Sequence, residues 1–117
     1  MASAVDAALG QPGGADLVVA QLSGLPGALA TPAKTGWRAR PASVQVGQWR
    51  VTPLPDGRLG AAHVVNGIVI AQEELGPGRG GSRVAEALAQ HVAAHGPRME
   101  DEVTAMVAGL LAAGGGY

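Results

Sequence analysis

The chain has 117 residues, of which 47% are hydrophobic and 3% aromatic, and it contains neither Cys nor Phe. This length fits one small domain, and the lack of Cys excludes disulfides, thiolate metal sites and cysteine nucleophiles. The formal net charge of −1 provides no general attraction to nucleic acid, and no stretch reaches the roughly 18–20 apolar residues of a membrane span. We therefore expect neither nucleic acid nor a membrane span.

The first segment, residues 1–42, is rich in Gly, Ala and Pro. It can hold a short helix from about Asp16 to Leu22, because Asp16 would lie at the positive end of the helix dipole. Its first residues include no basic region before the apolar ones, which is not typical of a signal peptide and favours the cytoplasm. We expect this segment to be only partly ordered and to precede the main α+β domain at 43–113.

The middle of the chain predicts an antiparallel meander. Three apolar, β-branched runs indicate strands at about 44–53, 58–65 and 68–74. An Asp-Gly pair at 56–57 and an Asn-Gly pair at 66–67 separate the runs, and both favour two-residue hairpins with type I′ turns, which need positive φ. The apolar phase shifts at Gly47, which predicts a β-bulge in the first strand.

Two helices are predicted after the meander. Ser82 can cap the first, and Gly96-Pro97 ends it. The second carries an apolar stripe that suits a core or a dimer face: Met99, Val103, Met106, Val107, Leu110 and Leu111. The expected fold class is α+β, with a three-stranded antiparallel meander packed against two C-terminal helices, a partly ordered N-terminal segment and a flexible tail at 114–117.

Between the last strand and the first of these helices lies the Gly-rich loop "GPGRGGS", residues 76–82. The loop has the sequence pattern GxGxxG between a strand and a helix, and this pattern places backbone N–H groups and a helix N-terminus where they could hold an anion. The candidate anion-binding residues are Gly78, Arg79, Gly80, Gly81, Ser82 and Arg83. The loop lacks the Lys of a triphosphate-binding loop, and no parallel strand is predicted after the helix, so a dinucleotide site is not expected.

The stretch "GIVIAQEELGPGRGGSRVAEALAQHVAAHG" resembles in outline one element of the GCN5-related acyltransferase family. In that family a strand leads into an Arg- and Gly-rich loop and then a helix, whose amides hold the pyrophosphate of coenzyme A. The resemblance covers about 30 residues. It departs at Ser82 and Val84, which occupy the two small-residue positions of the family motif when it is read from Arg79.

The histidines and tryptophans allow further interpretations. His91 and His95 are four residues apart on one predicted helix and could share a metal, although a zinc site needs further ligands. Their place in a last helical turn also suits the negative end of the dipole, so neither a metal nor another cofactor is expected. Trp37 and Trp49 stand beside arginines, as in proteins that stack on single strands, but we expect Trp49 in the core and Trp37 partly docked.

No arrangement typical of a hydrolase is found, because the Ser residues lie outside a nucleophile-elbow context. We therefore expect a non-enzymatic protein-interaction or assembly module, alone or as a piece of a larger protein, with a protein partner or a second copy. The candidate interaction residues are Met99, Val103, Met106, Leu110 and Trp37. The alternative is a small acyl-CoA-binding or acyltransferase-like protein that holds a pyrophosphate in loop 76–82.

Overall fold

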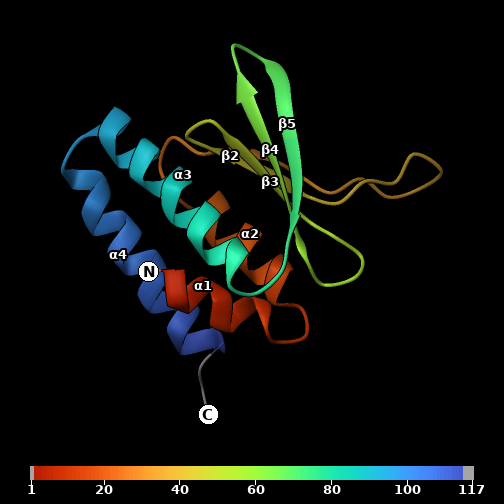
Figure 1. Cartoon of the computed structure of the whole chain (residues 1–117), viewed down its shortest axis with the longest axis horizontal. Helices are drawn as coiled ribbons and strands as arrows, with labels where there is room; N and C mark the ends of the chain where they lie inside the picture. The colour runs from red at the N-terminus through yellow and green to blue at the C-terminus, as the bar shows by residue number, and fades with distance from the viewer. Residues whose placement is uncertain (1, 115–117) are drawn as a thin grey trace.

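The computed structural model describes residues 2–114 and shows an α+β protein with four helices and a five-stranded antiparallel meander (Figure 1). Two helices precede the sheet and two follow it: α1 (Ala2–Leu9), α2 (Gly14–Ser23), α3 (Arg79–His95) and α4 (Arg98–Gly114). The strands are β1 (Leu29–Thr31), β2 (Ser43–Val46), β3 (Trp49–Pro53), β4 (Leu59–Val65) and β5 (Ile68–Leu75), and each pairs with the next along the chain.

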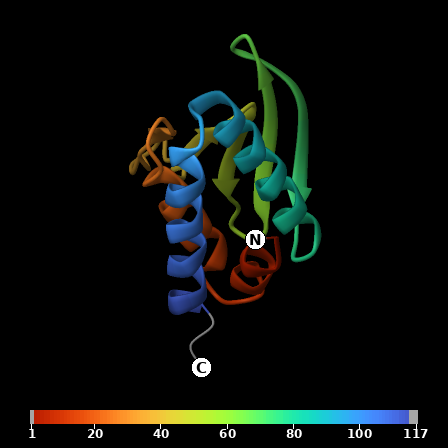
Figure 2. The ribbon, with the colours of Figure 1, turned by 90° about the vertical axis from the view of Figure 1, so that its left-hand side faces the viewer.

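The helices lie on one face of the sheet, as the two views show together (Figures 1 and 2). Helices α2 and α3 contact the sheet, whereas α1 and α4 contact these two helices. Apolar side chains from all four helices and from β2 to β5 form one buried cluster. None of the helices within residues 2–114 is long and apolar enough to cross a bilayer.

The N-terminal segment is more ordered than predicted. Besides the predicted helix, which lies within α2, it forms α1 and β1. Val5 of α1 and Val18 of α2 are fully buried and belong to the same cluster as Val84 of α3. The sequence did not reveal α1 because a short, Ala-rich stretch is marginal as a helix until neighbouring elements cover its apolar face. Of the predicted tail, Gly114 ends α4, and the residues after it lie outside the described part of the chain.

The sheet has five strands rather than three, and the predicted first strand is in fact a hairpin. Strands β2 and β3 pair with Val44 opposite Val51 and Val46 opposite Trp49. The shift of apolar phase at Gly47 therefore marks a turn and not a bulge. Gly47 is the first of the two turn residues and has φ of 59°, whereas the second, Gln48, does not have positive φ. This is the pattern of a type II′ turn, in which only the first turn residue needs positive φ. The register shift of this sheet lies instead between β4 and β5, beside His63.

The two predicted turns are both found, but only one has the predicted type. Asn66 and Gly67 have φ of 52° and 80°, which confirms a type I′ turn between β4 and β5. Between β3 and β4 the N–H of Leu54 donates to the carbonyl of Arg58 at 2.9 Å, which closes a three-residue loop. Only its last residue, Gly57, has positive φ (87°), so this hairpin combines a tight turn with a left-handed glycine.

The connection between β1 and β2 forms a projecting hairpin, which we call the basic arm and define as residues 29–42. Lys34 and Arg40 pair across it through two backbone hydrogen bonds of 2.9 Å. Gly36, with φ of 101°, allows the chain to reverse beyond that pair. The arm extends away from the sheet on the side opposite α3 and α4 (Figure 1). The arm places Lys34, Arg38 and Arg40 in solvent, within the segment that was expected to be only partly ordered.

Candidate functional site

The start of α3 is held by a carboxylate of the protein itself. Helix α3 begins at Arg79, and its flanking residue Gly78 has φ of 98°. Asp6 of α1 accepts hydrogen bonds from the backbone N–H of Gly78 at 2.6 Å and of Gly81 at 2.8 Å. A carboxylate is stabilised there by the unpaired amides and by the positive end of the helix dipole. The candidate anion-binding loop therefore already contacts an anionic group, supplied from within the chain.

Ser82 does not cap this helix, contrary to the prediction. It lies inside the first turn of α3, and its hydroxyl donates back to the carbonyl of Gly78 at 3.4 Å. The cap position is Gly78, four residues before Ser82, and Asp6 supplies the acceptor that Ser82 was expected to provide. Nothing in the sequence near the loop indicates Asp6, since 75 residues separate it from Gly81.

The two central glycines of the loop allow α1 to approach α3 closely. A Cβ on Gly81 would lie 2.2 Å from the carbonyl oxygen of Ala2, and one on Gly80 would lie 2.3 Å from Cδ1 of Leu9. Both Gly80 and Gly81 are buried. A side chain at Gly81 would require a shift of α1 itself, whereas one at Gly80 would require the end of the Leu9 side chain to move. Close helix packing thus accounts for these glycines without a ligand.

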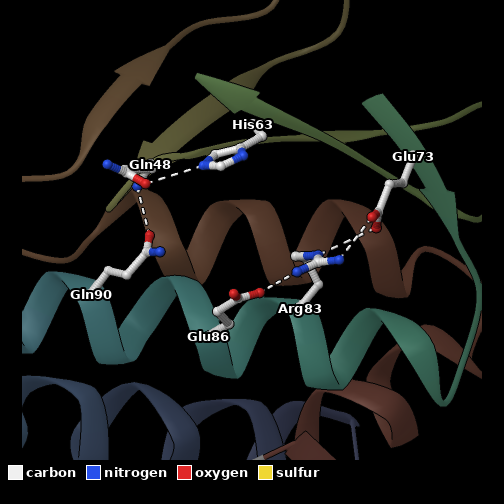
Figure 3. Close-up of polar contacts among 6 residues, drawn as sticks. All are labelled: Gln48, His63, Glu73, Arg83, Glu86 and Gln90. Carbon is white, nitrogen blue, oxygen red and sulfur yellow. Dashed lines mark hydrogen bonds and ion pairs between the residues drawn. The ribbon is translucent and has the colours of Figure 1, made fainter. Parts of the chain in front are cut away.

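Next to this loop, Arg83 binds two carboxylates where α3 meets β5 (Figure 3). Its Nη2 lies 2.7 Å from Oε1 of Glu73, its Nε donates to Oε2 of the same residue at 3.3 Å, and its Nη1 pairs with Glu86. The hydrogen bonds to Glu73 raise the pKa of Arg83 above its usual range. The guanidinium carbon also lies 4.2 Å from the ring centroid of Trp49. Both carboxylates therefore share the single positive charge of Arg83.

A second polar chain connects the β2–β3 turn to α3 and β4 (Figure 3). The backbone N–H of Gln48 donates to Oε1 of Gln90 at 2.9 Å, and the side-chain Oε1 of Gln48 lies 3.1 Å from Nε2 of His63. The imidazole of His63 stacks on Trp49 with ring centroids 4.6 Å apart. Trp49 is 5% exposed, which confirms its predicted place in the core.

The remaining predicted residues are distributed over the molecule. Arg79 is exposed at the start of α3. His91 is buried, and its Nε2 lies 2.7 Å from the carbonyl oxygen of Pro26, whereas Nδ1 of His95 lies 2.9 Å from the carbonyl oxygen of His91. In the part of the chain that the structure describes, no three His, Asp or Glu residues are grouped so that they could hold a metal ion.

The apolar stripe of α4 lies in the protein's own core. The four residues of this stripe that were predicted as interaction residues are between 1% and 5% exposed: Met99, Val103, Met106 and Leu110. They contact the neighbouring helices and offer no surface to a partner while the chain is folded in this way. Leu111, beside them, is 53% exposed. The stripe thus belongs to the core, which is one of the two roles predicted for it.

The basic arm is exposed at every residue from 29 to 41. Trp37 is 90% exposed, so it is not partly docked as expected, and the guanidinium carbon of Arg38 lies 4.8 Å from its ring centroid. Within residues 2–114 the cations found in ion pairs are Arg58 and Arg83, which leaves Lys34, Arg38 and Arg40 without a carboxylate. A large aromatic side chain with unneutralised cations around it is a candidate interface.

Comparison with known proteins identifies a family but no characterised relative. Neither a curated protein nor a solved structure matches the chain. The family described as "Domain of unknown function (DUF5073)" matches residues 1–112. This match includes both N-terminal helices, the whole sheet and nearly all of α4. The chain therefore belongs to the DUF5073 family.

Proposed function

We propose that this protein is a non-enzymatic interaction module that uses the basic arm to bind an acidic surface of a protein partner. The observation that carries the proposal is the exposure of Trp37, which is 90% exposed and lies in the turn beyond the Lys34–Arg40 pair of the arm. Trp and Arg are the residues that most often dominate the binding energy of protein interfaces, because they combine a large apolar area with hydrogen-bond donors. Both occur side by side at the tip of the arm.

The arm also has the charge and the order that such a role needs. Lys34, Arg38 and Arg40 have no acidic residue near them in sequence, since no Asp or Glu occurs between Asp16 and Asp56. The backbone pair of Lys34 with Arg40 holds the hairpin in shape before a partner arrives. A preformed hairpin loses less conformational entropy on binding than a disordered segment does.

The polar groups near α3 support a module without catalysis. Glu73 and Glu86 are both engaged by Arg83, and Asp6 by the amides of Gly78 and Gly81. Binding of coenzyme A by loop 76–82 is the alternative function. To bind there, the pyrophosphate of coenzyme A would have to displace Asp6 from the amides of Gly78 and Gly81, because the acyltransferase resemblance implies that such loop amides hold the pyrophosphate.

The proposal is tested by placing a photoactivatable amino acid at position 37 in cells, with position 108 as the matched control on the exposed face of α4. We expect a cross-linked protein product at position 37 that is absent at position 108. The purified product should bind the wild-type chain and bind Trp37→Ala at least about tenfold more weakly. Equal binding of both chains, or no product specific to position 37, would contradict the proposal.

A further inference from the structure

We infer that the basic arm inserts Trp37 into a groove between α3 and α4 of a second copy of this chain. The inference rests on the proposed function, because it names the partner of the same arm. It commits to a second copy because this chain carries, on another part of its surface, both the apolar hollow and the negative charge that the arm requires.

The receiving groove has an apolar floor and small side chains along one wall. It measures about 480 Å³ and opens between α3 and α4. Ala85, Ala89 and Ala93 line the α3 side, and their short side chains leave room for a large one. Val103, which is 3% exposed, lies at the α4 side. An aromatic ring seated there would replace water on both apolar surfaces, which is the main source of favourable free energy in such contacts.

The edge of the groove is acidic. Glu100 lines it from the first turn of α4. Asp101 and Glu102, the next two residues, are exposed on the same turn but do not line the groove. No ion pair within residues 2–114 involves any of these three carboxylates. The arm carries three cations that are equally without a carboxylate. Each surface therefore has the charge that the other lacks, and this complementarity would steer and orient the contact.

The positions of arm and groove determine the kind of assembly. In Figure 1 the arm extends to the right of the sheet, and α3 and α4 lie on the left. Turning the molecule so that its left side faces the viewer brings α3 and α4 to the front in Figure 2. Because the two surfaces lie on opposite sides, two copies cannot exchange both arms at once. The contact is head-to-tail, and it adds further copies unless it closes into a ring.

The free edge of β5 is the other surface that a second copy could use, and it supplies a control. Ile68, Val69 and Ile70 are exposed there. Ala71 of β5 lies opposite His63 of β4, and Val69 lies opposite the next residue, Val64. Ile70, between them, has no partner on β4 and forms a β-bulge. Bulges disturb the regular row of edge groups that strand pairing needs. We therefore expect Ile70→Lys to leave the assembly unchanged.

The deciding experiment measures sedimentation of three exposed-site variants over a range of concentrations: Trp37→Ala in the arm, Glu100→Arg at the groove and Ile70→Lys at the edge. The wild type and Ile70→Lys should form species larger than dimers. Trp37→Ala and Glu100→Arg should each associate at least about tenfold more weakly. Their equimolar mixture should stop at a one-to-one dimer, since only one intact arm meets one intact groove. Unchanged unfolding midpoints verify that each variant is folded.

Several results would overturn the inference, and they are separable from failure of the proposed function. Loss of assembly in Trp37→Ala but not in Glu100→Arg would mean that the arm binds elsewhere, which leaves the proposed function standing. A wild-type monomer, or loss of assembly only in Ile70→Lys, would exclude the arm-to-groove contact. Binding of a single-stranded oligonucleotide that Trp37→Ala abolishes would overturn both, because the partner would then not be a protein.

Discussion

Asp6 accepts a hydrogen bond of 2.8 Å from the backbone N–H of Gly81, 75 residues further along the chain. This contact joins the first helix to the start of the third. The loop has the GxGxxG pattern of a phosphate-binding loop, but the carboxylate of Asp6 already occupies the helix N-terminus at which a phosphate would bind. The relationship between these two residues connects the N-terminal segment to the rest of the domain.

Removing the carboxylate should weaken that connection. We expect Asp6→Ala to lower the free energy of unfolding by about 1–2 kcal/mol, because two amides lose their acceptor and the helix loses a favourable charge. Urea unfolding followed by circular dichroism measures the change. Asp16→Ala is the matched control, since Asp16 lies in the first turn of α2 and accepts no side-chain hydrogen bond within residues 2–114. Equal losses in both variants would contradict the special role of Asp6.

The adjacent glycines should respond differently to the same substitution. Gly81→Ala places a Cβ against backbone of α1 and against the carboxylate of Asp6, so we expect a loss of about 1–3 kcal/mol in the free energy of unfolding. Gly80→Ala meets only the end of the Leu9 side chain, which can rotate. Alanine has a higher helix propensity than glycine, which offsets part of the cost of moving Leu9, so we expect a change near zero in the free energy of unfolding. A reversed order in thermal unfolding would show that α1 does not pack as described.

Arg83 should contribute more to stability than Arg58, although each pairs with two carboxylates. Its side chain is 26% exposed against 48% for Arg58, and it also contacts Trp49. We expect Arg83→Met to lower the free energy of unfolding by about 1–2 kcal/mol, since Glu73 is then left partly buried without a counter-charge. Arg58→Met should cost clearly less, because exposed pairs are screened by solvent. Parallel urea titrations compare them, and equal costs would be contrary to this expectation.

Coenzyme A should not stabilise the wild-type protein. Asp6 already holds the amides of Gly78 and Gly81, so a pyrophosphate would have to displace it. We expect no change in melting temperature at millimolar coenzyme A or acetyl-CoA. A true ligand at a hundred times its dissociation constant would add about 2.7 kcal/mol. A rise in melting temperature that Arg79→Glu abolishes would instead favour the acyltransferase-like alternative and argue against a module without a cofactor.

The acidity of Asp56 provides a pH test of the β3–β4 turn. Hydrogen bonds from the side chain and the backbone of Arg58 hold the pKa of Asp56 below its usual range. A lowered pKa in the folded state means that the interaction stabilises the turn above the ordinary Asp pKa and is lost as the pH falls through the lowered value. Carbon NMR should show this depression, and Arg58→Gln should reduce it, because the side-chain hydrogen bond is its larger cause while the backbone N–H remains. An unshifted Asp56 would contradict the described turn.

Local sequence signals predicted the parts of the fold whose cause is local. The Asn-Gly pair at 66–67 specified its turn because positive φ at both positions is a property of those two residues. The stripe of α4 predicted a buried face, since the 3.6-residue period brings its apolar side chains to one side. The Gly-rich segment 76–82 does lie where a strand gives way to a helix, but only residues 76–78 form the connection, because α3 begins at Arg79.

The parts that sequence reasoning missed depend on contacts between distant segments. A change of apolar phase at Gly47 is compatible with a bulge or a turn, and only the pairing of β2 with β3 distinguishes them. Helix α1 and the cap by Asp6 exist because α3 and α4 cover the first residues of the chain. The exposure of Trp37 likewise follows from the arm having no element to cover it. Sequence alone determined the class of the fold and the type of the Asn-Gly turn, because dihedral preferences and periodicity act over a few residues. The tertiary structure decided which charges are neutralised and which remain open to a partner, because burial and pairing depend on segments that meet only after folding.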